Sequence, residues 1–382
     1  MELLSKFFQC YRLLWRKILF YKLIYPLHDY FQGFELIRYI SFRAGLAAIT
    51  AFLISLLVGS QVIKILKKNK VSEDTSKTDS ETLKDLHSEK KNVPTMGGII
   101  ILIAIIISTV LWCDIFNIYI LLVLFTAVWL GVLGFFDDYI KLTQKHASGL
   151  TSTSKLFFQC GLGLIIGLIL YFHFKNVDEG TKLVIPFFKE VRPDLGAFYV
   201  LMVMFFVVGM SNAVNIADGL DGLAIGCTVI AALAFTLIAY IVGRIDFSSY
   251  LQVPYIAGTG ELSIFCSALV GAGLGFMWFN CYPAQTFMGD VGSLPLGGIL
   301  GIVAIIVKQE LLIFFIGSIF IVEAFSVLLQ VGIYKISGKR LFLCAPLHHH
   351  FQFKGWPETK ITMRFFIIAA IMALFSLITL KL

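Results

Sequence analysis

The sequence has few charged residues. Only 14% of its 382 residues are Asp, Glu, Lys or Arg, whereas 58% are hydrophobic. A soluble domain cannot bury that much apolar surface. The shortage of charge therefore excludes an ordinary soluble protein and predicts an integral membrane protein, whose solvent is largely lipid.

Other common signals are also missing. The seven cysteines include no CxxC pair, which argues against a disulfide framework or a zinc site. Arg12, Arg16, Lys17 and Lys22 interrupt the first 40 residues, so these do not form the apolar core of a signal peptide. Residues 1–37 are instead predicted to be a basic, aromatic N-terminal extension at the membrane interface. The net charge of +7 lies mostly beside apolar segments, which favours anionic lipid over nucleic acid as the partner.

Ten apolar runs approach the length of about 20 residues that crosses the hydrocarbon of a bilayer. They lie near residues 40–66, 96–113, 117–136, 155–174, 196–211, 222–243, 260–279, 294–308, 310–334 and 362–381. The predicted fold is therefore all-α. It is a polytopic membrane protein with about ten transmembrane helices, and residues 38–382 form one domain.

Alternating spans divide the loops into two sets. One set is 67–95, 137–154, 212–221, 280–293 and 335–361, and it carries most of the Lys and Arg residues of the loops. The positive-inside rule predicts that this set is cytoplasmic and that both chain termini are periplasmic, although the basic N-terminal segment opposes the rule. Every cluster of unusual polar residues also falls in this set, so the site is expected on the cytoplasmic face.

The first cluster is Asp137-Asp138, directly after an apolar run. In a continuing helix, Lys141 lies on the same face as both carboxylates, at i+4 and i+3. One interpretation is a solvated helix end with an internal ion pair. The other is a general base or a divalent-metal site, since hard cations prefer carboxylate oxygens.

A second cluster repeats polar residues at every third position. Asn212, Asn215, Asp218 and Asp221 cannot all share one face of an α-helix, because the stripe drifts about 60° at each step. The glycines that follow also disfavour a regular helix. A broken helix or tight loop between the fifth and sixth spans is predicted, and such backbone is tolerated where it lines a wet cavity.

Three further clusters complete the set. Residues 280–293 include Asn280, Phe287, Gly289 and Asp290, where glycine lets backbone approach a ligand closely and Phe could stack on a base. The run His348, His349 and His350 does not make a zinc triad on one helix face, so contacts to phosphate or sugar, or packing at a helix end, are the alternatives. Lys90 and Thr95 precede a helix start that suits anion binding or simple membrane anchoring.

Together these clusters place carboxylates, lysines and histidines on one membrane face. Carboxylates hold Mg²⁺, while Lys and His neutralise phosphate oxygens, and phosphoryl transfer requires this combination. A lipid substrate would explain a site at the bilayer boundary. An ion-coupled transporter is the alternative from another class, but it predicts carboxylates near the midplane of the bilayer.

Five strings resemble the phospho-N-acetylmuramoyl-pentapeptide-transferases, within the polyprenyl-phosphate sugar-1-phosphate transferases. They are PTMGG (94–98), GFFDDYIK (134–141), NAVNIADGLDGLAIG (212–226), FNCYPAQTFMGDVGSLPLGG (279–298) and APLHHHFQFKGWPE (345–358). The resemblance runs from about residue 38 to the C-terminus. It implies an enzyme of peptidoglycan synthesis in the bacterial inner membrane. Such an enzyme transfers phospho-N-acetylmuramoyl-pentapeptide from UDP to undecaprenyl phosphate, releases UMP and uses Mg²⁺ as the cofactor.

The resemblance also implies roles for individual residues. Asp290 would bind Mg²⁺, Asp137 would deprotonate or orient the lipid phosphate beside Asp138, and Lys141 and Lys155 would stabilise charge. The substrate-binding set would be Lys90, Thr95, Asn212, Asn215, Asp218, Asp221, Asn280, Phe287, Gly289, His348, His349 and His350. Direct attack by the lipid phosphate is favoured over a covalent intermediate at Asp290, because a metal-bound carboxylate is a poor nucleophile.

Two positions depart from the family pattern. Gln352 stands where an acidic residue is expected after the histidines, and Ala217 stands where Thr is usual. Gln keeps a hydrogen-bond acceptor but lacks the charge. Transfer of N-acetylglucosamine-1-phosphate to the same lipid is the alternative activity within this superfamily, and the oligomeric state, a homodimer included, stays open.

Overall fold

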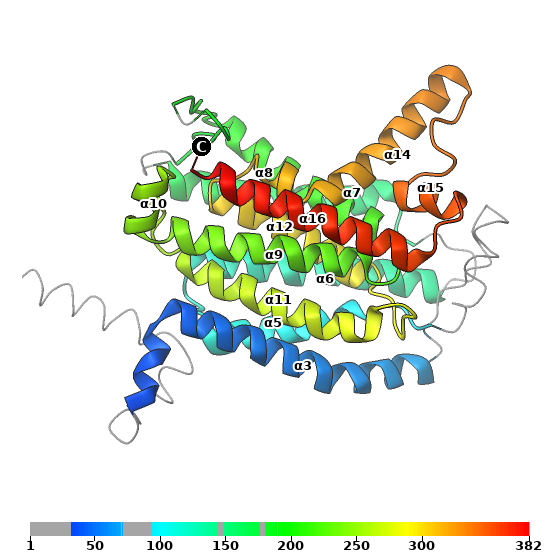
Figure 1. Ribbon diagram of the computed structural model, residues 1–382, viewed down its shortest axis with the longest axis horizontal. Coiled ribbons are helices and arrows are strands. Elements are labelled where there is room, and N and C mark those ends of the chain that lie inside the picture. Colours follow the sequence, from blue (N-terminus) through cyan, green and yellow to red (C-terminus); the bar gives the residue numbers. More distant parts are fainter. Residues whose placement is uncertain are drawn as a thin grey trace, which may run out of the picture.

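The computed structural model describes residues 32–69, 71, 93–143, 149–175, 180–188 and 190–381. Lys90 and most of the predicted N-terminal extension lie outside these residues. The described chain is almost entirely helical, with one isolated β-bridge between Lys182 and Asp194. Figure 1 shows long helices that run side by side in one bundle. The prediction of an all-α polytopic fold is confirmed.

The helices follow the apolar runs of the sequence. In chain order they are η2 (Gln32–Arg38), α3 (Ile40–Lys68), α5 (Gly98–Trp112), α6 (Ile118–Thr143), α7 (Ser152–Phe174), α8 (Phe198–Ala217), α9 (Leu223–Val242), α10 (Ile245–Leu251), α11 (Gly260–Asn280), α12 (Asp290–Ile306), α13 (Ile313–Ile316), α14 (Ser318–Ser337), α15 (Leu347–Phe353) and α16 (Glu358–Thr379). Among the described residues, eight helices are long and apolar enough to cross a membrane, and α5 and α12 are shorter apolar helices. These ten correspond to the ten predicted spans.

Two boundaries differ from the prediction. The helix α8 continues through Asn212 and Asn215 to Ala217, so the predicted loop shrinks to residues 218–222. The helix can continue because both Asn side chains find hydrogen-bond partners on neighbouring helices. The ninth predicted span is interrupted at Gly317, which separates α13 from the long α14.

The helix α12 is buried along its whole length of 17 residues. At 1.5 Å per residue it spans about 26 Å, slightly less than the hydrocarbon core. It packs against α6 and α8, while α11 packs against α3 and α9. Contact between α6 and α12 is close: a Cβ added at Gly134 would overlap the carbonyl oxygen of Asp290. This contact positions the first residue of α12 beside the end of α6.

The end of the bundle farthest from the polar clusters has its own buried ion pair. Arg43 on α3 is 1% exposed and donates to both carboxylate oxygens of Glu261 on α11, at 2.7 and 3.0 Å. Arg43 also donates to the carbonyl of Trp112 at the end of α5. The pair therefore ties together three helices without contributing to the polar clusters at the opposite end.

Candidate active site

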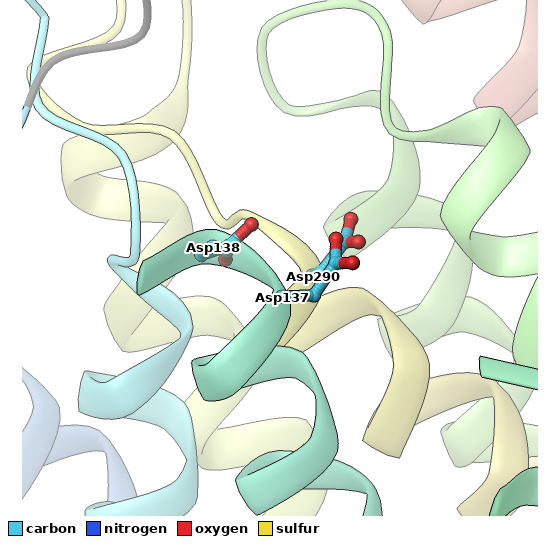
Figure 2. Close-up of side chains that lie close together, drawn as sticks. All are labelled: Asp137, Asp138 and Asp290. Carbon is cyan, nitrogen blue, oxygen red and sulfur yellow. The ribbon is translucent and has the colours of Figure 1, made fainter. Parts of the chain in front are cut away.

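Three buried aspartates from two helices form the centre of the site. Asp137 and Asp138 lie in the last turns of α6, and Asp290 is the first residue of α12 (Figure 2). One carboxylate oxygen from each lies within 4.8 Å of the others. Their exposed fractions are 1%, 4% and 8%. An all-oxygen donor set of this size fits a hard divalent cation such as Mg²⁺.

Two lysines neutralise part of this charge. Lys141 Nζ lies 2.6 Å from Asp137 Oδ2, 3.5 Å from Asp138 Oδ1 and 3.1 Å from Asp290 Oδ2. Lys155 Nζ, from the first turn of α7, lies 2.5 Å from Asp290 Oδ2 and 3.5 Å from Asp137 Oδ2. The i+3 and i+4 spacing on α6 is therefore confirmed. Three carboxylates against two ammonium groups leave one net negative charge, which suits an added cation.

Neutral donors fix the remaining carboxylate oxygens. Asn215 Nδ2 donates to Asp290 Oδ1 at 2.6 Å and also to Ser293 Oγ at 2.8 Å. The backbone N–H of Leu150 donates to Asp137 Oδ1 at 2.8 Å, and that of Val291 donates to Asp138 Oδ2 at 3.2 Å. Because each carboxylate accepts from a different segment, the orientation of the three aspartates depends on α6, α8, α12 and the residues directly before α7.

Gly289 has both a conformation and a location that require glycine. Its φ is +70°, and a Cβ there would lie 2.6 Å from Asp138 Oδ2 and 3.0 Å from Thr95 Oγ1. Thr95 is buried. The segment around it pairs with the loop before α12, since Phe287 N donates to Pro94 O and Gly97 N donates to Phe287 O, both at 2.8 Å. Thr95 therefore lies near Asp138 at Gly289, and the backbone of Phe287 pairs with the segment on either side of Thr95.

The turn between α8 and α9 is joined to the loop between α11 and α12. Asp221 Oδ2 accepts from Ala284 N at 2.9 Å, and the backbone N–H of Asp221 donates to Glu358 Oε1 at 2.6 Å. Asn280 Oδ1 accepts from Gly222 N at 3.1 Å, while its Nδ2 donates to Thr286 O at 2.9 Å. Asp221 and Asn280 therefore shape the two loops; Asp218, the C-cap of α8, borders the same turn.

The three histidines of α15 have different surroundings. His348 is fully buried, and its backbone N–H and Nδ1 lie 3.1 and 3.2 Å from the two carboxylate oxygens of Glu323 on α14. A Cβ added at Gly219 would overlap His348 Nε2, so this ring packs on the turn between α8 and α9. His349 Nδ1 lies 2.7 Å from Gln352 Oε1. Gln352, the departure noted in the sequence, thus retains a polar contact.

His350 is partly exposed and accepts a hydrogen bond. Leu343 N donates to its Nδ1 at 3.1 Å, which requires that Nδ1 carry no proton. Partial burial and the nearby charge of Lys354 lower the pKa of His350 below its ordinary value near 6.5. At neutral pH the imidazole of His350 is therefore neutral, and its Nδ1 can accept the hydrogen bond from Leu343 N.

Asn212 is separated from the three aspartates. Its Nδ2 donates to Gln159 Oε1 on α7 and to Val208 O, both at 2.9 Å. The sequence reasoning did not single out Gln159 or Glu323, although each is a polar side chain inside an apolar span. Polar side chains are rare in spanning helices and usually have a function. The presence of Gln159 and Glu323 in apolar runs of the sequence could therefore have identified them as candidate functional residues.

Comparison with known proteins identifies the relatives of this chain. Residues 120–308 match the sequence profile of glycosyl transferase family 4. The phospho-N-acetylmuramoyl-pentapeptide-transferase of Desulfotalea psychrophila is 48% identical over 365 residues, which cover 95% of this chain and 100% of the relative. The chain belongs to the phospho-N-acetylmuramoyl-pentapeptide-transferase family. The member from Desulforapulum autotrophicum is also 48% identical, over 94% of this chain and 98% of its own length.

Family membership makes the chain a multi-pass transferase of a bacterial membrane. In this member of the family, the three-aspartate site lies at the ends of two apolar helices, α6 and α12. The transporter alternative expects carboxylates near the bilayer midplane, so the observed placement and the family agree against it.

Proposed function

We propose that this enzyme transfers phospho-N-acetylmuramoyl-pentapeptide from UDP to undecaprenyl phosphate, and that it releases UMP. An oxygen of the lipid phosphate attacks the phosphorus that carries the sugar, and the bond from that phosphorus to the UMP oxygen breaks. The product is a lipid-linked diphosphate. The observation that carries the proposal is the meeting of Asp137, Asp138 and Asp290 with two lysines at one end of the spans, in a chain of this family.

The aspartates and lysines divide the chemical work. Asp290, with Asp137 and Asp138, would hold Mg²⁺, which when bound supplies positive charge to the diphosphate oxygens. Asp137 would orient or deprotonate the lipid phosphate, supported by its place in the last turns of α6, in contact with both lysines. Lys141 and Lys155 would donate to the phosphate oxygens, where negative charge must be stabilised in phosphoryl transfer. Neither step requires a covalent aspartyl intermediate.

The two joined loops would hold the nucleotide and the sugar. Asp221 and Phe287 would contact the uridine, and this is supported by their position on the joined loops between α8 and α9 and between α11 and α12. Asn280 would hold the uridine through the structure of these loops, because both ends of its buried amide are bonded to them. Thr95, Asn215 and Asp218, together with Lys90, would contact ribose and phosphates. His349 and His350 would meet the sugar, whereas the burial of His348 favours support of the turn that it packs on. Asn212 would act through Gln159 rather than by direct contact.

The site would face the cytoplasm of a bacterial inner membrane. The support is the concentration of Lys and Arg in the loops at this end of the bundle, by the positive-inside rule. Both termini would then be periplasmic, with residues 1–37 as an interfacial extension and residues 38–382 as the transferase domain. Undecaprenyl phosphate could then reach the site from the membrane and the UDP-sugar from the cytoplasm.

One assay tests this function. Purified enzyme is incubated with undecaprenyl phosphate and either UDP-N-acetylmuramoyl-pentapeptide or UDP-N-acetylglucosamine, with Mg²⁺ or with EDTA, and UMP and lipid product are measured. We expect product only when the muramoyl donor and Mg²⁺ are both present, and none with EDTA. Product only from UDP-N-acetylglucosamine would overturn the proposed donor and favour the superfamily alternative.

A further inference from the structure

A second layer of hydrogen bonds lies one helical turn deeper in the bundle than the aspartate site. Gln159 on α7 accepts from Asn212 Nδ2 at 2.9 Å and donates from Nε2 to Ser211 Oγ at 3.2 Å. Ser211 Oγ in turn donates to the carbonyl of Leu294 on α12 at 3.0 Å. The layer therefore connects α7, α8 and α12, three of the four helices that meet at Asp290.

The register of the two layers is the same on each helix. Gln159 follows Lys155 by four residues on α7, Ser211 precedes Asn215 by four residues on α8, and Leu294 follows Asp290 by four residues on α12. Four residues of helix rise about 6 Å and return to nearly the same face. The contacts of Lys155 and Asn215 with Asp290 are thus repeated, one turn deeper, by contacts among neutral groups.

Packing alone does not require a polar residue at position 159. Gln159 is 1% exposed and Ser211 is 0% exposed. A buried amide within an apolar span is costly unless both ends of it are hydrogen-bonded, and here both are. On the same turn of α7, Leu156, Phe157 and Phe158 face outward. The single inward polar group of this turn therefore sets how α7 is placed against α8 and α12.

A small shift of α7 would remove Lys155 from the site. Lys155 Nζ is 2.5 Å from Asp290 Oδ2, and a slide by one residue moves a side chain by 1.5 Å along the axis and turns it by about 100°. Besides its contacts with α8, α7 has few with the helix that carries Asp137. Deeper in the bundle, Gly163 and Gly167 pack closely on α8. Next to the site, the hydrogen bonds of Gln159 oppose such a slide.

We propose that Gln159 is a positioning residue, which holds Lys155 on Asp290 through its hydrogen bonds to Ser211 and Asn212. This inference rests on the proposed function, because it assigns to Lys155 a part in phosphoryl transfer. Gln159 touches no substrate. Its effect is on the number of productive active sites, so loss of its hydrogen bonds lowers kcat and leaves the KM for the nucleotide donor nearly unchanged.

The test compares Gln159→Met, which keeps the volume and removes both hydrogen bonds, with Leu156→Met on the outward face of the same helix. Two quantities are measured in the full-length enzyme: steady-state kinetics, and the rate at which an amine-reactive reagent modifies Lys155, read by mass spectrometry against exposed Lys335. We expect Gln159→Met to lower kcat by about tenfold, as a misplacement of about 1 Å can cost that much or more. Modification of Lys155 becomes several-fold faster, and Leu156→Met changes neither quantity.

A double variant separates positioning from general packing. If Gln159 acts through Lys155, Gln159→Met in a Lys155→Met background causes little further loss of kcat. An equal loss in both backgrounds, or unchanged modification of Lys155 in Gln159→Met, would overturn the proposal. Ser211→Ala, a milder change in the same layer, gives the same comparison if Gln159→Met does not fold. The modification rate does not depend on the donor, so a failure of the proposed function appears separately, as wild-type enzyme without product.

Discussion

Gly134 on α6 and Asp290 on α12 are in direct backbone contact, because a Cβ at Gly134 would overlap the Asp290 carbonyl oxygen. Gly134→Ala must therefore separate the two helices and move Asp137 and Asp138 away from Asp290. We expect activity to fall by about a hundredfold or more, since misplacement by 1 Å can have that effect. The measurement is kcat/KM in detergent, alongside thermal unfolding.

Gly131→Ala is the matched control for this change. It lies one turn earlier on α6, where the nearest atom to a new Cβ is Leu102 Cδ1 at 2.6 Å, the end of a flexible side chain. We expect it to retain most of the activity. Equal activities for the two variants would contradict a specific role for the contact between Gly134 and Asp290.

Lys141 competes with a metal ion for the same carboxylates. Its Nζ lies within 3.5 Å of oxygens from Asp137, Asp138 and Asp290. We predict that Lys141→Gln binds Mn²⁺ about tenfold more tightly, because a positive charge beside the ligands is removed, and that kcat nevertheless falls by about a hundredfold. Electron paramagnetic resonance titration of Mn²⁺ measures the first effect without any substrate.

Exposed Lys335 on α14 provides the control, since Lys335→Gln removes a charge away from the aspartates. Its Mn²⁺ affinity should equal that of the wild type. A Lys141→Gln variant with unchanged or weaker Mn²⁺ binding would show that the lysine and the metal do not share the carboxylates.

The sequence predicted the composition of the site better than its internal contacts. The length of the apolar runs predicts the ten spans, and helical spacing predicts the shared face of Asp137 and Lys141. The alternation of loops between the two membrane faces predicts that distant loops meet. These three properties can be read directly from the sequence. The partners of Asn212 and His348 do not, because they depend on which side chain of another helix lies opposite. Gln159 and Glu323 were overlooked for that reason: each looks like a single polar residue in an apolar run until its partner is located.

The end of α8 shows the same limit in the backbone. The polar repeat after residue 211 predicted a loop, since Asn and Gly disfavour helix in isolation. Tertiary hydrogen bonds from Asn212 to Gln159 and from Asn215 to Asp290 compensate that preference and extend the helix to Ala217. Within residues 212–222, Gly222, with a φ of +76°, is where the backbone adopts a conformation that favours glycine.

Asn280 should support donor binding through loop structure. Asn280→Ala removes the acceptor for Gly222 N and the donor to Thr286 O, both in buried surroundings. Each unmatched backbone group costs about 1–3 kcal/mol. We expect a lower unfolding temperature together with a several-fold higher KM for the UDP-sugar. Exposed Gln285→Ala in the same loop should change neither, and an Asn280→Ala variant with normal KM would argue that these loops do not hold the nucleotide.

The protonation of His350 should depend on Lys354. The pKa of His350 is lowered, so its neutral form is favoured by folding. Its stabilising contact with Leu343 N is fully present above the ordinary histidine pKa, and it is lost as the pH falls through the lowered pKa of the folded state. Lys354→Gln removes a positive charge and should raise the pKa of His350 toward 6.5. Nuclear magnetic resonance of ¹³C-labelled histidine measures this, with Lys360→Gln as control; an unchanged pKa in Lys354→Gln would contradict the assignment.

Glu323 should hold α15 in place through His348. Both of its carboxylate oxygens lie near buried nitrogen atoms of His348, at 3.1 and 3.2 Å, and the imidazole packs on Gly219. Glu323→Ala leaves the buried backbone N–H of His348 without its acceptor, at a cost of about 1–3 kcal/mol, and lets α15 move away from the turn between α8 and α9. We expect a lower unfolding temperature and a higher KM for the donor.

Glu323→Gln refines this last prediction, because its amide oxygen can still accept from His348 N–H while the charge is lost. If the unfolding temperature and the KM of Glu323→Gln lie between those of the wild type and Glu323→Ala, the hydrogen bond to His348 N–H accounts for part of the effect. Val322→Ala, at an outward position of α14 that is 49% exposed, controls for general weakening of the helix. If Glu323→Ala kept both the unfolding temperature and the KM of the wild type, then the packing of His348 on Gly219 alone would suffice to place α15, and the buried carboxylate would require another explanation.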